Sequence, residues 1–210
     1  MALRHSRLLN TLGALVLVAG VASPALAGPP LVCFPFDIGP ATSLPFDTNG
    51  WKGMRADYDV SHLTGDTIAL LTPSTPILVR METIRRASLY GTRDPQAARR
   101  LLDALLARAK SAATSSGSDA GLAEFDAGYL VETYRQAGPI SAASTAMVKD
   151  IDGYAMVSHS LAVRHNDPAI AFAAALMAPG GKADRAEHVK LAKSGIQSDL
   201  LLARNIEHVQ

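Results

Sequence analysis

The chain has 210 residues and a formal net charge of +1, and 19% of its residues are charged. This near balance gives no electrostatic basis for binding nucleic acid or anionic lipid, so we expect neither as a partner. A single cysteine cannot form a disulfide within the chain, and no segment shows the alternating pattern of a β-strand. The lack of strand alternation, together with short helical segments punctuated by proline and glycine, predicts an all-α protein.

Residues 1–27 have the features of a secretory signal peptide. Two arginines near the start supply positive charge, residues 8–21 are mostly apolar, and residues 25–27 (Ala-Leu-Ala) form a small-x-small cleavage pattern. The apolar run is too short and too interrupted for a stable membrane anchor. We expect cleavage after Ala27, leaving 183 of the 210 residues as a periplasmic or secreted protein.

Cys33 follows soon after the expected cleavage site. Lipidation is rejected because Val32, rather than a small residue, precedes the cysteine. A lone thiol can be buried as a small hydrophobe or can pair between two chains, and the sequence favours burial without excluding the pair.

Residues 28–56 form an extended segment that is rich in proline and aromatic residues. Five prolines exclude a helix. Disordered tails are usually poor in aromatic residues, so we expect this segment to pack against the helical body. A loosely held tail is one alternative, and a partner-docking strip is another. The anchors of such a strip would be Phe34, Phe36 and Trp51.

Residues 57–210 form the predicted helical domain, and its clearest helix begins at Pro95. Asp94 can cap the free amides, and proline suits the first helical position. The apolar residues then recur at the spacing of one buried helix face. They are Ala98, Leu101, Leu102, Leu105, Leu106 and Ala109.

The preceding helix is predicted to open in the same way, with Thr75 as the cap and Pro76 next. The short turn from Tyr90 to Arg93 predicts an antiparallel helical hairpin. Four charged residues of the first helix are spaced for ion pairing on an exposed face, which we expect to be solvated. They are Arg80, Glu82, Arg85 and Arg86.

Further helices are predicted by apolar spacing between proline and glycine breaks. They cover residues 59–71, 122–136, 141–165, 169–178, 183–193 and 198–206, and the stretch 141–165 is either one helix or two with a break at Asp152-Gly153. The segment 169–178 is apolar nearly all round but too short to span a bilayer, so we expect it to be the most buried helix.

Two helix openings of the same kind, Asp94-Pro95 and Asp167-Pro168, lie about two TPR-sized repeats apart. In this respect the helical body resembles TPR-like α-solenoid proteins. The stretch CFPFDIG…SLPF resembles the opening of uncharacterised exported bacterial proteins. The expected fold is a set of stacked antiparallel helical hairpins, as an α-solenoid or an irregular bundle. The TPR-like resemblance implies a binding scaffold without catalysis.

Known catalytic and metal-binding motifs are missing from the sequence, including HEXXH, G-x-S-x-G and a phosphate-binding loop. The nearest metal candidates are His159 and His165 with Asp167, and we expect surface or capping roles for them. No metal or cofactor is predicted. Tyr129, Glu132 and Tyr134 share one helix and are candidates for partner binding, although two tyrosines at this spacing are more often core or core edge.

Two functions remain open. The leading hypothesis is an exported helical scaffold that binds a protein or peptide. The alternative is a periplasmic hydrolase or lyase with a cleft lined by dispersed His, Asp and Glu. Convergence of His159, His165 and an acid in one pocket would favour the enzyme.

Overall fold

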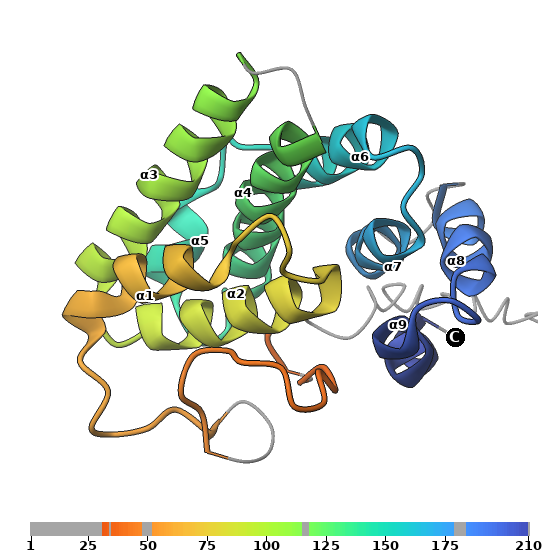
Figure 1. The fold of residues 1–210 in the computed structure, drawn as a ribbon. Helices are drawn as coiled ribbons and strands as arrows, with labels where there is room; N and C mark the ends of the chain where they lie inside the picture. The colour runs from red at the N-terminus through yellow and green to blue at the C-terminus, as the bar shows by residue number, and fades with distance from the viewer. Residues whose placement is uncertain (1–30, 34, 48–51, 115–117, 179–183, 210) are drawn as a thin grey trace, which may run out of the picture.

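A computed structural model describes residues 31–33, 35–47, 52–114, 118–178 and 184–209 (Figure 1). Within these ranges the chain forms nine α-helices and two short 3-10 helices, and no strand, so the all-α prediction is confirmed. The α-helices are α1 (Leu63–Leu70), α2 (Ile77–Gly91), α3 (Pro95–Ala112), α4 (Ser118–Gln136), α5 (Ala142–Met147), α6 (Gly153–Val163), α7 (Pro168–Met177), α8 (Asp184–Ser194) and α9 (Leu200–Asn205). The 3-10 helices are η2 (Val60–His62) and η3 (Ile206–Val209). The expected signal peptide and two expected anchors, Phe34 and Trp51, lie outside the described residues.

The helices pack as a bundle around α4. Helices α3 and α6 cover opposite sides of α4, and α2 crosses beneath it (Figure 1). Helix α7 packs against α8, and it also contacts α2, α4 and α6. Helix α4 is therefore the element that most of the other helices share.

Helix starts follow the expected cap chemistry with one exception. Asp94 accepts a hydrogen bond from the amide of Gln96 before Pro95, and Asp167 does the same for α7. The prediction that Thr75 caps α2 is wrong, because Pro76 holds the cap position. The Thr75 hydroxyl donates instead to the carbonyl oxygen of Leu70, at 2.7 Å, and so closes the end of α1.

Three glycines allow α4 and α6 to approach closely. A Cβ on Gly121 would lie 2.8 Å from Cγ of Arg164, and one on Gly128 would lie 2.8 Å from the carbonyl oxygen of Gly153. A Cβ on Gly153 would lie 2.6 Å from the carbonyl oxygen of Gly128. Ser160 donates to the carbonyl oxygen of Gly121 at 2.7 Å. Larger side chains at these positions would push the two helices apart.

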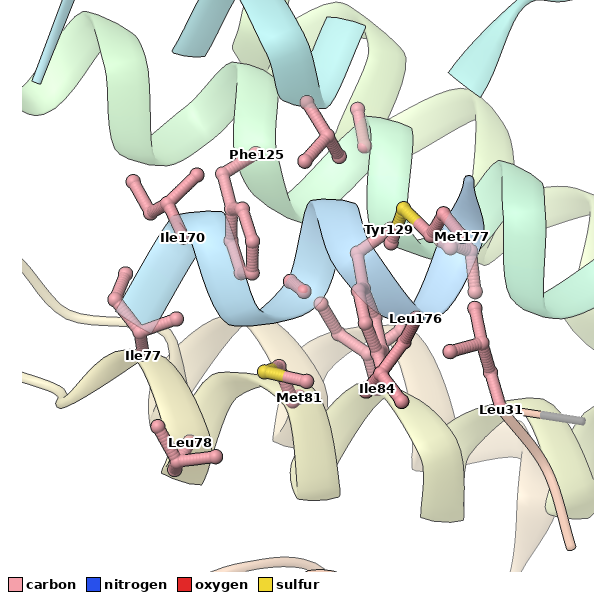
Figure 2. Close-up of a cluster of buried hydrophobic side chains, with 14 of the residues drawn as sticks. Leu31, Ile77, Leu78, Met81, Ile84, Phe125, Tyr129, Ile170, Leu176 and Met177 are labelled. Carbon is pink, nitrogen blue, oxygen red and sulfur yellow. The ribbon is translucent and has the colours of Figure 1, made fainter. Parts of the chain in front are cut away.

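The apolar helix α7 lies in the core, as predicted. All of its residues from Ala169 to Met177 are buried. Figure 2 shows its Ile170, Leu176 and Met177 among side chains of α2 and α4. The Phe172 ring packs edge-on against Phe36 of the N-terminal segment, with centroids 6.1 Å apart.

The expectation that the charged face of α2 is solvated is wrong. Arg80, Glu82 and Arg85 are almost fully buried, and only Arg86 retains partial exposure. Glu82 forms ion pairs of 2.7 Å with both Arg85 and Arg86. The spacing did predict these pairs correctly, but the N-terminal segment covers the helix face that carries them.

The described part of the N-terminal segment is extended and packed on the helices, as predicted. Its buried side chains are Leu31, Val32, Phe36, Ile38 and Leu44. The α2 side chains bind its main chain: Arg85 donates to the Val32 carbonyl oxygen at 3.1 Å, and Arg86 donates to that of Leu44 at 2.8 Å. The expected burial of Cys33 is wrong, because Leu31 and Val32 occupy the inward positions and Cys33 is exposed.

Candidate functional site: a groove between α3, α4 and α6

The apolar stripe predicted on α3 extends beyond the core. Its first part is buried, with Leu101, Leu102 and Leu105 at most 1% exposed. Leu106 and Ala109 are only partly buried, although they continue the same stripe. The stripe therefore ends on a surface that no described element covers completely.

That surface is one wall of a groove with a volume of about 440 Å³. Residues of α3, α4 and α6 line the groove. Helices α3 and α6 both pack on α4 (Figure 1). The lining of the groove is Leu106, Ala109 and Lys110 from α3, the C-cap residue Ala113, Gly121 and Glu124 from α4, and Met156, His159 and Val163 from α6. The volume falls in the range of known ligand pockets, about 300–1,000 Å³.

Each wall presents residues that are three or four positions apart on its helix. On α6 these are Met156, His159 and Val163, and Val163 is a large apolar residue that remains 36% exposed. Residues at this spacing share one helix face. The groove is therefore bounded by faces of two helices that could pack against a further helix.

The polar end of the groove is a hydrogen bond between side chains of two helices, α4 and α6. Glu124 Oε2 lies 2.6 Å from His159 Nδ1. A carboxylate can only accept a hydrogen bond, so Nδ1 is the donor and Nε2 is left for another group. The His159 side chain is 66% exposed. Lys110 is also exposed, and no ion pair to it is found among the described residues.

A second hollow of about 460 Å³ lies near the C-terminal end of α4. Its charged groups are largely occupied by one another: Glu132 pairs with Arg135 at 3.2 Å, and Lys149 lies 3.8 Å from Asp150. Arg135 also donates to the carbonyl oxygens of Val148 and Ile151. These contacts fix the α5–α6 connection, so we assign this hollow a structural role.

Four of the partner-binding candidates fall in the described residues, and all four are buried. Tyr129 and Tyr134 are fully buried on α4, which agrees with the alternative that such a pair belongs to the core. Phe36 is 5% exposed and Glu132 is 7% exposed. None of the four offers its side chain to a partner in this arrangement.

Burial also governs the chemistry of the two tyrosines. The Tyr134 hydroxyl donates to the Ala98 carbonyl oxygen at 3.0 Å, and burial raises its pKa. Tyr129 has no hydrogen-bond partner among the described residues, and burial raises its pKa well above the ordinary value. Both phenols therefore stay protonated near neutral pH.

The histidine candidates do not form a metal centre. Asp167 caps α7, and His165 has a positive φ of 55° just after α6. Among the described residues, no group of three His, Cys, Asp or Glu could hold a metal ion. The acid that meets His159 is Glu124, which sequence reasoning had not selected because it belongs to another helix. In the sequence, the spacing of Met156, His159 and Val163 was the pattern that could have indicated a shared helix face.

The chain matches no known family model, and no curated protein or solved structure is significantly similar to it. In the described part of the chain, no helix combines the length and apolar character needed to cross a membrane.

Proposed function

We propose that this protein is an exported interaction scaffold whose groove between α3, α4 and α6 binds a helical segment of a partner protein or peptide. The proposal rests on the two walls of the groove, because apolar residues recur at helical spacing on both α3 and α6. A helix that lays its apolar face into such a groove is a common mode of peptide recognition. The expected signal peptide would place the encounter in the periplasm or outside the cell.

The chemistry of the groove defines its occupant further. Leu106, Met156 and Val163 provide apolar contact, and the small Ala109 and Ala113 leave room for the backbone of a helix. Lys110 on the α3 wall favours an acidic side chain on the occupant. The expected ligand is an amphipathic helix with apolar anchors three to four residues apart and a carboxylate beside them.

Selection from a library of displayed peptides tests this proposal. Peptides enriched on the wild-type protein should carry that pattern and should lose binding to Ala113→Trp, which fills the groove. Ala107→Trp is the matched control, because Ala107 is exposed on the same helix and does not line the groove. Enriched peptides that bind both variants equally would contradict the proposal.

One observation favours the alternative of a hydrolase or lyase. Glu124 holds Nδ1 of His159 at 2.6 Å, which leaves Nε2 of this groove-lining residue for another group, as a general base requires. Screening ester, amide and glycoside substrates tests this function. Turnover that falls at least about a hundredfold in His159→Ala would support it, since general bases contribute at least this factor. Turnover that persists in the variant would place the chemistry elsewhere or in a contaminant.

A further inference from the structure

A smaller cavity is lined by residues of α2, α3 and α4 and by the chain that follows α1. Its volume is about 40 Å³. Apolar residues such as Leu71 and Leu122 form part of its wall, and the charged groups Arg80, Arg108 and Asp126 complete it. This space is enough for a water molecule or a monatomic ion.

Two polar atoms in this wall have unused bonding capacity. Asp126 is 1% exposed, and its Oδ2 lies 2.6 Å from Arg80 Nη1. Its other oxygen, Oδ1, is buried and has no partner among the described residues, and the same holds for Arg108 Nη1. A buried polar atom without a hydrogen bond is costly, so a species in the cavity that binds both atoms would stabilise the fold.

The charges of the cluster do not cancel. Arg80 also donates to the carbonyl oxygens of Thr72 and Thr75, and Arg108 donates to that of Leu71. These acceptors are neutral, so two guanidinium groups that cannot lose their protons face a single carboxylate. The excess positive charge favours an anion in the cavity, while an ionised Oδ1 would repel it.

We propose that this cavity binds one small monovalent anion of the size of chloride, together with a proton on Asp126. The protonated Oδ1 donates a hydrogen bond to the anion, and Arg108 Nη1 donates a second. The proton and the anion bind cooperatively. The proton removes the negative charge of Asp126 that would repel the anion, and the anion in turn favours the protonated carboxyl. Arg80 from α2 and Arg108 from α3 supply the charged neighbours of Asp126.

The protonation state of Asp126 supports this coupling. Burial raises the pKa of its carboxyl to about 6, and the two arginines oppose the increase. The proton is therefore available at mildly acidic pH. A bound anion would raise this pKa further, since binding linkage is reciprocal.

Thermal unfolding in sodium chloride and in sodium gluconate of equal ionic strength tests the proposal, because gluconate is too large for the cavity. At about pH 5, chloride should raise the unfolding midpoint by about 3–5 °C relative to gluconate, and at about pH 8 it should have no effect. Equal chloride effects at both pH values, or none at either, would overturn the proposal. The second result would assign the cavity to a water molecule.

Variants of the cavity residues, with a control on the same helix, and a direct measurement of chloride binding complete the test. Asp126→Asn is neutral and carries an N–H donor, so its chloride effect should persist at high pH. Arg108→Gln should lose the effect, while Arg99→Gln, an exposed arginine on the same helix, should retain it. Chloride-35 NMR linewidths of the wild-type protein should broaden at low pH only. Broadening that is unchanged by Arg108→Gln would overturn the assignment.

Discussion

Two of the charged regions in the described part of the chain have opposite consequences. On α2, Glu82 binds Arg85 and Arg86, and all three also bind main-chain atoms of the N-terminal segment. In the groove, Glu124 and His159 pair at 2.6 Å beside a volume of about 440 Å³.

The two regions differ in whether charged groups remain available to bind a ligand. The Glu82 carboxylate accepts from two arginines and from the Phe36 amide, so it has little left for a ligand. In the groove, His159 is mostly exposed and Lys110 has no ion-pair partner in the described part of the chain. A charged cluster therefore indicates a binding site here only where it is incomplete and borders a cavity. We expect substitutions in the first region to reduce stability and substitutions in the second to reduce binding.

The largest effect is expected from Glu82→Ala. This change leaves the buried guanidinium of Arg85 without its carboxylate, and unpaired buried charges are costly. The free energy of unfolding should fall by about 5 kcal/mol, the upper end of the range for broken buried ion pairs. Urea denaturation followed by circular dichroism measures it. Asp103→Ala, which breaks an exposed pair with Arg99, should cost only about 0.5 kcal/mol. Equal costs would show that the α2 network is not a stabilising element.

Phe172→Ala should cost slightly less. The ring is fully buried on α7 and packs against Phe36, so its removal leaves a cavity in the core. We expect a loss of about 4 kcal/mol in the free energy of unfolding, from the same denaturation experiment. Leu200→Ala is the control, because Leu200 is 66% exposed, and it should change stability by at most about 0.5 kcal/mol. A small loss for Phe172→Ala would mean that α7 is not the centre of the core.

The third prediction concerns Asp126, whose contribution to the free energy of unfolding should depend on pH. Burial raises the pKa of Asp126 to about 6 in the folded protein, so the folded state holds this proton more tightly than the unfolded state does. The contribution of Asp126 to stability is therefore greatest below about pH 4 and falls as the pH rises to about 6, by on the order of 3 kcal/mol. The difference in unfolding free energy between wild type and Asp126→Asn, measured in chloride-free buffer across this range, isolates the contribution. A difference that does not change with pH would contradict the assignment.

The fold was largely predictable because its signals are local. Asp94 and Asp167 cap the helices that they were expected to cap, and the apolar composition of residues 169–178 predicted their burial. The burial of Arg85 was not predictable in this way. It depends on the carbonyl oxygen of Val32, which is 53 residues away in sequence.

The candidate site could not be predicted from the sequence for a similar reason. Glu124 and His159 are 35 residues apart on different helices, and neither belongs to a recognised motif. Only the spacing of Met156, His159 and Val163 indicated that α6 presents a mixed apolar and polar face. The tyrosines of α4 gave a stronger recognition signal, yet their side chains fill the core.

A charge exchange between the groove and its ligand tests the proposed function most directly. Calorimetry would measure the affinity of a selected acidic peptide for the wild-type protein and for Lys110→Glu, with Lys190→Glu, at an exposed lysine of α8, as the control. The groove variant should bind at least tenfold more weakly, a loss of about 1.4 kcal/mol, and should regain affinity when the peptide carboxylate is replaced by lysine. Its unfolding free energy should remain within about 0.5 kcal/mol of wild type. Unchanged affinity in Lys110→Glu, or an equal loss in Lys190→Glu, would contradict the groove as the binding site.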